Sequence, residues 1–216
     1  MKNTLEIDSV ILAFGLKKVL QDVYLKCETG NVTGLLGRNG SGKSCLLNIL
    51  FGELDALDKS IRINGNYLDT ARILSHDIKY LPQNNFIPKK LTVARVFNDF
   101  GLSFDAFCAL FPLYSSLQDQ RIDSLSGGQV RIIEIYVILL SDAKFCLLDE
   151  PFSEVMPLHV DIIKQLIIKQ KDKKGILITD HLYQHVLDIS DNLYVIRNGK
   201  THIARDKSDL EKLGYL

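Results

Sequence analysis

The sequence predicts an α/β fold whose core is built around a parallel sheet. Three short apolar runs in the second half of the chain alternate with helix-like sequence, which is the rhythm of β-α-β units. The runs cover residues 145–148, 176–179 and 193–196, and a helix-like stretch at 158–170 lies between the first two. A glycine-rich loop at 37–44 follows a strand-like stretch and opens a helix-like one, which suits the same architecture.

Two further regions are predicted to extend this core. Residues 5–36 alternate short apolar runs with turns, and residues 61–65 add another strand and turn, so the N-terminal part is predicted to be antiparallel and β-rich. Residues 86–140 have helical patterns and are expected to form an inserted helical subdomain. The chain has 216 residues, 46% of them apolar, and we expect residues 1–216 to form a single domain.

The glycine-rich loop carries the most informative motif. It contains Gly37, Arg38, Asn39, Gly40, Ser41, Gly42, Lys43 and Ser44, the full pattern G-x-x-x-x-G-K-S. The glycines let backbone N–H groups face one phosphate chain, Lys43 supplies charge for the β- and γ-phosphates, and the Ser44 hydroxyl can ligate Mg²⁺. The loop, with Cys45 after it, is expected to bind a nucleotide, which predicts a P-loop NTPase core. A glycine-rich turn that matches by chance is the alternative.

Two carboxylates end the apolar run 145–148. Such a run suits a buried parallel strand with its acids at the carboxyl edge of the sheet. Asp149 would hold Mg²⁺, directly or through water, and Glu150 would face the γ-phosphate and polarise the attacking water. The alternative is a strand followed by a solvated turn.

A second glycine pair opens a helix-like stretch at 130–140. The segment Leu125–Gln129 reads Leu-Ser-Gly-Gly-Gln, and its Ser126, Gly127, Gly128 and Gln129 would form another anion cradle. This second phosphate-binding motif is far from the first in the sequence and has no obvious ligand in its own chain. Its presence is explained if it completes the nucleotide site of another copy of the chain. This signature segment resembles that of the ATP-binding cassette (ABC) family, and the phosphate loop, signature and acidic strand occur in the family's order.

The resemblance implies roles for three more residues. Phe14 is similar to the aromatic residue that stacks on adenine, although tyrosine is commoner there. Gln83 resembles the glutamine that closes on Mg²⁺ and the attacking water and links the core to the helical insertion. His181 ends another strand-like run and resembles the switch histidine that contacts the γ-phosphate. The other histidines are interpreted as surface or packing residues: His76, His159, His185 and His202.

One short segment departs from the family pattern. Met156 occupies the place of the aspartate that contacts the opposite subunit's phosphate loop, and Glu154 stands where glycine is common. The departure concerns the coupling of two sites and leaves the residues that touch ATP intact. Either the interface carboxylate is lost at Met156, or a shifted turn lets Glu154 supply it.

Composition excludes several classes of partner and of location. There are 26 basic and 26 acidic residues, which argues against a nucleic-acid or polybasic membrane surface. No stretch approaches eighteen apolar residues, and the start of the sequence lacks the apolar core of a signal peptide. The four cysteines have neither paired metal spacing nor a disulfide-rich density, so reduced thiols and a cytoplasmic location are expected.

The insertion holds a stripe of phenylalanines at helical spacing: Phe97, Phe100, Phe104, Phe107 and Phe111. Such a stripe predicts a buried helix face, which Gly101-Leu102-Ser103 would split in two with Ser103 as a cap. Alternatively, some of the rings line a groove for a helix of a membrane partner, as the resemblance to ABC transporters implies.

Three functions are consistent with the motifs. The first is the ATP-hydrolysing subunit of an ABC transporter, which closes as a homodimer or heterodimer on ATP and sits on the inner face of the membrane through a separate transmembrane permease. The second is a soluble, non-transport ABC-type ATPase; the 41 residues between Gln83 and Leu125 (84–124) are too few for the long coiled coil of a DNA-repair type. The third, a small-molecule P-loop kinase, leaves the signature and Glu150 without a role.

Within transporters, the segments 147–152 and 178–181 resemble the branch that includes ATPases for lipopolysaccharide export and branched-chain amino-acid uptake.

Overall fold

The computed structural model describes residues 2–68 and 77–215, so the expectation for His76 lies outside the described residues. A six-stranded sheet forms the centre of the molecule, in the order β11-β10-β4-β9-β8-β7. Its strands are β11 (Lys200–Ala204), β10 (Asn192–Arg197), β4 (Val32–Gly37), β9 (Gly175–Thr179), β8 (Phe145–Asp149) and β7 (Ile78–Leu81). All neighbours pair in parallel except β10 and β11, which pair antiparallel. The predicted parallel sheet is therefore confirmed.

A second, antiparallel sheet is built mainly from the N-terminal part of the chain. It contains β2 (Lys17–Leu20), β1 (Thr4–Phe14), β3 (Leu25–Glu28), β5 (Asp58–Ile63) and β6 (Asn66–Tyr67). The prediction for residues 5–36 is correct up to β3 and wrong for β4, which lies inside the parallel sheet. Every residue of β4 is buried, because β9 and β10 flank the strand and other elements cover both of its faces.

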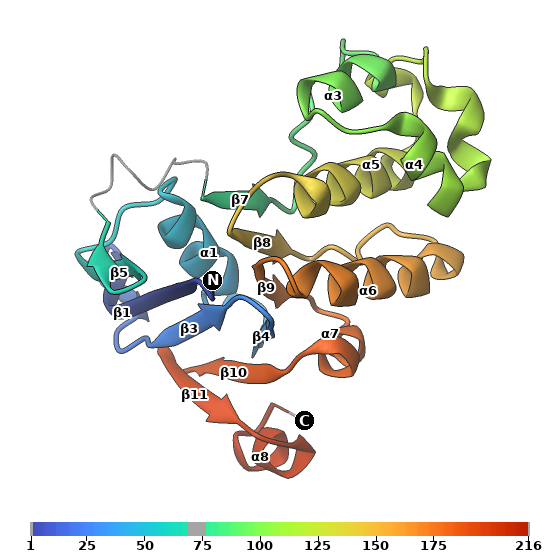
Figure 1. Ribbon diagram of the computed structural model, residues 1–216. Coiled ribbons are helices and arrows are strands. Elements are labelled where there is room, and N and C mark those ends of the chain that lie inside the picture. Colours follow the sequence, from blue (N-terminus) through green and yellow to red (C-terminus); the bar gives the residue numbers. More distant parts are fainter. Residues whose placement is uncertain (1, 69–76, 216) are drawn as a thin grey trace.

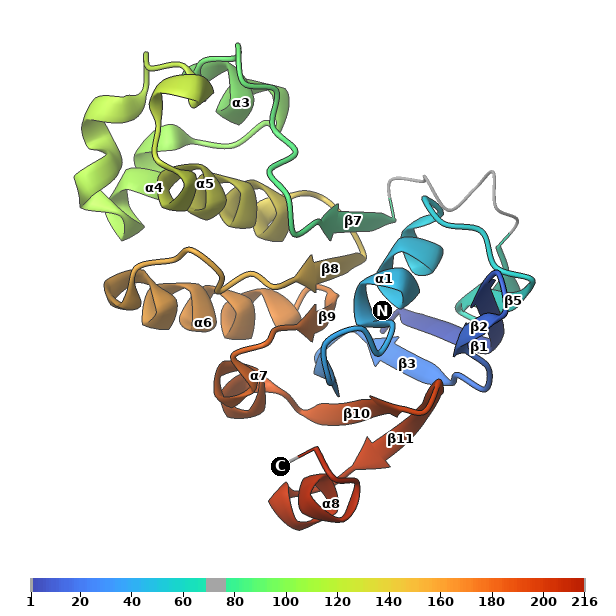
Figure 2. The ribbon, with the colours of Figure 1, turned by 180° about the vertical axis from the view of Figure 1, so that it is seen from behind.

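The central strands send alternate side chains to two separate hydrophobic clusters. In β8, Phe145 and Leu147 belong to the cluster shared with the antiparallel sheet and α1 (Lys43–Phe51), whereas Cys146 and Leu148 belong to the cluster on the opposite face. On that opposite face α6 (Pro157–Lys171) and α7 (Tyr183–Ile189) pack on β4 and β9. Figures 1 and 2 show the resulting layers from the two sides. The sheet is thus buried on both faces, as its near-continuous apolar strands require.

The helical insertion lies between β7 and β8 and forms a lobe at that edge of the sheet (Figure 1). It contains α3 (Val93–Asp99), α4 (Phe104–Leu110), the 3-10 turns η1 (Pro112–Leu117) and η2 (Ile122–Ser124), and α5 (Gly127–Leu140). Ser103 caps α4 by accepting a hydrogen bond from the Ala106 N–H at 3.2 Å, as predicted. Phe97, Phe107 and Phe111 are fully buried, so the stripe is mainly a core face.

The C-terminal part ends in α8 (Lys207–Lys212), which packs on β11. In the part of the chain that the structure describes, no helix is both long and apolar enough to span a bilayer.

Candidate nucleotide-binding site

The carboxyl ends of four parallel strands meet at one edge of the central sheet. The phosphate loop follows β4, Gln83 follows β7, Glu150 follows β8, and His181 follows β9. Parallel pairing brings these strand ends side by side although they lie between residues 37 and 181 of the sequence. Four motifs that were recognised separately in the sequence thus converge on one place.

The phosphate loop needs its glycines for two different physical reasons. Gly40 and Gly42 have φ angles of +74° and +104°, a backbone conformation that side-chain-bearing residues rarely adopt. A Cβ at Gly42 would also lie 2.8 Å from the Leu20 side chain, and one at Gly37 would lie 2.5 Å from Ser41 Oγ. Gly42 is the N-cap of α1. The loop therefore ends at a helix N-terminus, where the first backbone N–H groups have no partner within the helix and can bind an anion.

Lys43 is buried beneath the loop that it belongs to. Its Nζ donates hydrogen bonds to the carbonyl oxygens of Gly37, at 2.8 Å, and of Arg38, at 3.4 Å. Burial lowers the pKa of this ammonium, and the negative charges of Glu150 and Asp149 oppose that shift. The charge is held beside the loop, where a phosphate chain would lie.

Asp149 presents one unpaired oxygen towards the loop side of the sheet edge. Its side chain is 1% exposed, its Oδ2 accepts a hydrogen bond from Tyr80 Oη at 3.1 Å, and its Oδ1 is buried without a partner among the described residues. Burial raises the pKa of this carboxyl, while the neighbouring hydroxyls of Ser44 and Tyr80 lower it. The nearby Gln83 Nε2 donates to Ser44 Oγ at 3.4 Å.

These residues fit a magnesium ion. An unsatisfied carboxylate oxygen, a hydroxyl and a side-chain amide are hard oxygen donors of the kind that Mg²⁺ takes, usually with a few protein ligands, waters and substrate phosphates. Among the described residues, no group of three or more His, Cys, Asp or Glu side chains is placed to hold a metal ion by itself.

Glu150 and His181 face each other across the end of the sheet. Glu150 Oε2 lies 3.5 Å from His181 Nδ1 and accepts a hydrogen bond from Ser153 Oγ at 3.3 Å. Glu150 has a φ of +51°, a strained conformation for a residue with a side chain and one that recurs at functional sites. The strained turn directs the carboxylate away from the strand and towards the loop.

Asp180 holds the segment before His181 in place, a role that sequence reasoning missed. It is fully buried, and it accepts hydrogen bonds from the N–H groups of Phe152, at 2.9 Å, and Leu182, at 2.8 Å. Burial raises the pKa of this carboxyl, and the two N–H groups lower it. Because the acid follows an apolar strand just as Asp149 does, the sequence contained a signal for it.

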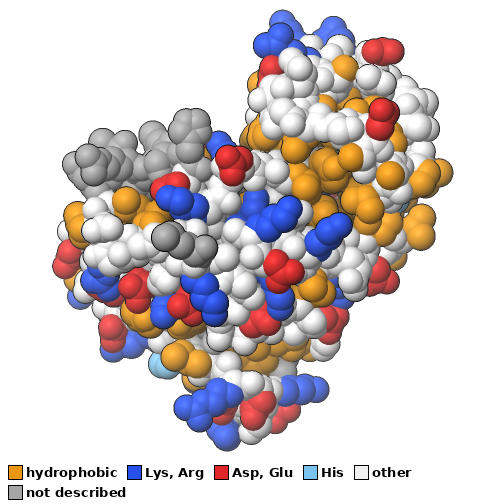
Figure 3. All heavy atoms as spheres, in the orientation of Figure 1, with side chains coloured by type: hydrophobic (Ala, Val, Ile, Leu, Met, Phe, Trp, Pro, Cys, Tyr) orange, Lys and Arg blue, Asp and Glu red, His pale blue; other side chains and the backbone are white. Residues whose placement is uncertain are grey.

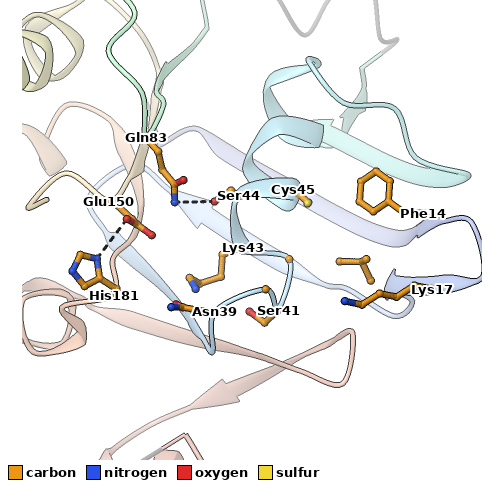
Figure 4. Close-up of a pocket in the computed structure, with 13 residues that line it drawn as sticks. Phe14, Lys17, Asn39, Ser41, Lys43, Ser44, Cys45, Gln83, Glu150 and His181 are labelled. Atoms are coloured by element: carbon orange, nitrogen blue, oxygen red, sulfur yellow. Dashed lines mark hydrogen bonds and ion pairs between the residues drawn. The ribbon is translucent and has the colours of Figure 1, made fainter.

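Most of the predicted residues line one cavity of about 560 Å³. Figure 4 shows its lining, with Phe14 and Lys17 at one end, Glu150 and His181 at the other, and Lys43 and Ser44 between them. The predicted residues on the wall are Phe14, Asn39, Gly40, Ser41, Gly42, Lys43, Ser44, Cys45, Gln83, Glu150 and His181. Gly37 and Arg38 belong to the same loop but not to this wall, and Phe14 is 55% exposed. Lys17 and Val19 also line the cavity and were not predicted. They lie on β2, the strand that comes after Phe14 in the chain.

The signature segment lies outside the lining of this cavity. Ser126 caps α5: its Oγ accepts from the Gln129 N–H at 3.3 Å, and Gln129 Oε1 accepts from the Ser126 N–H at 2.9 Å. Gly127 and Gly128 form the first turn of the helix. The segment therefore has the structure of an anion-binding helix start, and the structure does not join it to the phosphate loop of its own chain.

A buried ion pair connects α5 to both halves of the cavity wall. The guanidinium of Arg131 donates to the carbonyl oxygens of Pro82, at 2.6 Å, Asp149, at 2.7 Å, and Glu150, at 3.0 Å. Arg131 lies 3.6 Å from Glu134, whose Oε1 accepts from the Phe86 N–H at 2.7 Å. Burial lowers the pKa of Arg131 and raises that of Glu134, and their mutual attraction opposes both shifts. Two charged residues on a mainly apolar helix are the sequence signal for this pair.

Comparison with known proteins identifies the family. The model of the ABC transporter family matches residues 20–153. A lipopolysaccharide export system ATP-binding protein, LptB of Haemophilus influenzae, is 33% identical over 202 residues, which cover 85% of this chain and 83% of the relative. A high-affinity branched-chain amino acid transport ATP-binding protein, BraG of Pseudomonas aeruginosa, is 30% identical over 210 residues, 91% of this chain and 90% of the relative.

Solved structures show the same fold. A nucleotide-free ATP-binding cassette from an ABC transporter superposes with a TM-score of 0.78 at 25% identity, covering 99% of this chain and 96% of that one. An ATP-binding subunit of an ABC transporter gives a TM-score of 0.81 at 23% identity, with coverage of 97% and 93%. Since the family model spans more than half of the chain and the similarity runs through nearly its full length, the chain belongs to the ABC transporter family and is an ATP-binding ATPase of that family.

Proposed function

We propose that the chain binds ATP with Mg²⁺ in the 560 Å³ cavity and that two copies close head-to-tail around two nucleotides. The observation that carries this proposal is the separation of the phosphate loop from the signature segment within one chain. The phosphate loop lines the cavity with Glu150 and His181, whereas Ser126–Gln129 begins a helix outside that lining. A complete site needs both a phosphate loop and a signature segment around the same nucleotide. One chain supplies the loop, and the second copy supplies the signature segment.

The chain's own residues divide the work of hydrolysis. Lys43 and the loop N–H groups bind the β- and γ-phosphates, and Phe14, which is exposed at the cavity rim, stacks on adenine. Ser44, Gln83 and Asp149 would hold Mg²⁺, which neutralises charge that develops on the phosphates.

Glu150 acts on water. Its carboxylate accepts a proton from, or orients, the attacking water, while His181, 3.5 Å away, contacts the γ-phosphate and fixes the carboxylate. Asp180 and Arg131 hold the backbones on either side of these two residues, since they bind the N–H of Phe152 and the carbonyls of Asp149 and Glu150. The strand ends thus present a rigid catalytic pair.

We further propose that a separate transmembrane permease docks on the groove beside β7, which would hold the chain at the cytoplasmic face of a membrane. The groove has a volume of about 300 Å³ and a mainly apolar wall: Phe51, Glu53, Lys79, Tyr80, Pro82, Phe86, Phe100 and Ile138. In Figure 3 the surface is hollowed between the helical insertion and the rest of the molecule, and apolar side chains gather over the insertion. The relatives named above are ATP-binding proteins of transport systems, which supports this partner.

The groove also links docking to the nucleotide. Phe86 lines the groove, and its N–H is bound by Glu134, the partner of Arg131. A helix that presses on Phe86 would therefore act on the segment that carries Gln83. An apolar groove next to this segment suits the docking of a partner helix, and the transport relatives favour a permease as that partner.

A complementation experiment tests the closure of two chains. The Lys43→Ala chain loses its phosphate loop and the Ser126→Arg chain loses its signature, so each homodimer contains no complete site. A mixed dimer keeps one intact loop opposite one intact signature. We expect the mixture to recover partial ATP-dependent dimerisation and hydrolysis that neither parent has. If the mixture behaves like its parents, each chain works alone and the proposal is wrong.

The groove is tested by co-purification from solubilised membranes of the source cells. Phe86→Asp should lose a multi-span membrane protein that the unchanged chain retains, because a charge in an apolar groove must be desolvated. Leu110→Asp, at a 40% exposed position on α4 outside the groove lining, is the matched control and should retain it. Retention by Phe86→Asp, or no membrane protein with the unchanged chain, contradicts the docking proposal.

A further inference from the structure

Glu154 lies directly on the first turn of α5. A Cβ at Gly127 would be 2.7 Å from Glu154 Oε2, and a Cβ at Gly128 would be 2.6 Å from the Glu154 carbonyl oxygen. The two signature glycines therefore accommodate the Glu154 backbone and carboxylate at once. A side chain at Gly128 would force the Glu154 backbone to move, whereas one at Gly127 would displace the Glu154 carboxylate.

The position of Glu154 is maintained against backbone strain. Its φ is +62°, in the left-handed region that glycine adopts freely and a glutamate does not. The neighbouring Ser153 is held by its hydrogen bond to Glu150, so the turn is tied to the catalytic strand end. The strained residue is thus fixed between Glu150 and the signature helix.

The carboxylate of Glu154 lies beside the first turn of α5. Among the described residues Glu154 forms no ion pair, and its side chain is exposed. Lys89 and Arg131 share with it a polar cavity of about 370 Å³, but Arg131 is already bound to three carbonyl oxygens and Glu134. The first N–H groups of a helix lack partners within the helix and attract an anion, so the carboxylate is favoured where it lies.

We propose that Glu154 is a gating residue for ATP-driven closure: its carboxylate stands beside Gly127, where the phosphates of the opposite chain's nucleotide must approach. This inference rests on the proposed head-to-tail dimer. Two anions cannot share one helix start without repulsion, so closure requires Glu154 to move aside. Glu154 therefore sets the ATP concentration at which two chains close. It does not supply the interface carboxylate missing at Met156, because it faces its own α5.

The test uses the full chain in a Glu150→Gln background, in which slow hydrolysis preserves the closed dimer. Sedimentation at increasing ATP gives the concentration for half-maximal dimerisation. Glu154→Gln keeps the shape of the side chain and removes its charge, and we expect this concentration to fall by about tenfold. The difference should shrink at high salt, because an exposed charge is screened. A purely structural role of Glu154 would not produce this salt dependence.

Two further variants keep the result interpretable. Glu154→Gly removes both the charge and the left-handed strain, folds at least as well as the parent, and should also lower the required ATP concentration. Asp142→Asn removes an exposed carboxylate just beyond the opposite end of α5 and should leave the required ATP concentration unchanged.

An unchanged or higher ATP concentration for both Glu154 variants overturns the gating role while the dimer itself stands. A higher value would mean that Glu154 contributes a favourable contact across the interface. If the Glu150→Gln parent and its Glu154 variants all stay monomeric at saturating ATP, head-to-tail closure fails and the gating role fails with it.

Discussion

The strand ends and the signature region differ in how tightly their residues are held. At the strand ends, Lys43, Asp149 and Asp180 are almost completely buried, and each forms hydrogen bonds with backbone groups or with Tyr80, although one oxygen of Asp149 has no partner among the described residues. The turn beside the signature segment, which carries Glu154 and Met156, differs: both side chains are exposed. Both residues also stand where the resemblance to the family leads one to expect another residue. The contrast is therefore between buried, hydrogen-bonded residues of the site proposed within one chain and solvent-exposed residues proposed to meet another chain.

This contrast suggests that chemistry and coupling are set by different parts of the molecule. A buried polar group is costly to change, because its partners are left unsatisfied, so the chemical machinery stays fixed. An exposed interface residue can change with little effect on folding and can still alter how two chains meet. Three predictions, in order of decreasing expected effect, test the contrast.

The largest effects are expected at the strand ends. Lys43→Ala should abolish ATP binding, because Lys43 holds charge against the phosphates in the ground state. Glu150→Gln should retain ATP binding and slow turnover by about 10²–10⁴-fold, because Glu150 acts on water in the transition state. Nucleotide-binding and hydrolysis assays separate the two effects. Equal loss of binding in both variants would show that these roles are wrongly assigned.

The second prediction concerns the ion pair that joins the two regions. Arg131→Leu leaves Glu134 buried beside its lost partner and should lower the free energy of unfolding by about 3 kcal/mol. The matched control is Arg121→Leu, which breaks an exposed pair with Asp123 and should cost about 1 kcal/mol or less. Denaturant titration measures both values. Equal losses would mean that the buried pair is no more important than a surface pair.

The smallest expected effect lies at Met156. Met156 is 52% exposed and is the N-cap of α6 without a side-chain capping bond. Met156→Asp should raise basal hydrolysis about tenfold, because one positioned polar contact across the interface is worth about 1–3 kcal/mol, and should leave ATP affinity nearly unchanged.

A capping control separates two causes at Met156. Met156→Asn also caps α6, which should add about 1 kcal/mol of stability, but it lacks the charge. If asparagine raises turnover as much as aspartate, helix capping and not the interface carboxylate is responsible. If neither variant gains activity while Glu154→Ala loses most of it, Glu154 supplies the carboxylate after all.

Motif and periodicity were sufficient to predict the fold class and to single out most of the residues that line the cavity. Buried parallel strands have continuous apolar sequences that end in polar residues, so β8 and β9 and the acids after them were predictable. The phosphate loop is a local structure whose glycines are required by its own backbone. The cap at Ser103 and the buried face of the phenylalanine stripe are local for the same reason.

What the sequence did not show depends on contacts between distant segments. Arg131 finds its acceptors 18, 19 and 49 residues away, and nothing in a helix pattern indicates which carbonyl oxygens a buried guanidinium will meet. The assignment of β4 to the parallel sheet follows from pairing with β9 and β10, more than a hundred residues downstream. The contact of Glu154 with Gly127 also requires the fold to bring the two turns together.

The central claim is that a complete hydrolytic site needs two chains. The dependence of specific ATPase activity on chain concentration tests it most directly, because a shared site disappears on dilution. At saturating ATP, we expect activity per chain to rise steeply over about a thousandfold range of concentration and then to level off as dimers form. Activity per chain that stays constant over that range would show that each chain hydrolyses ATP alone and would contradict the account.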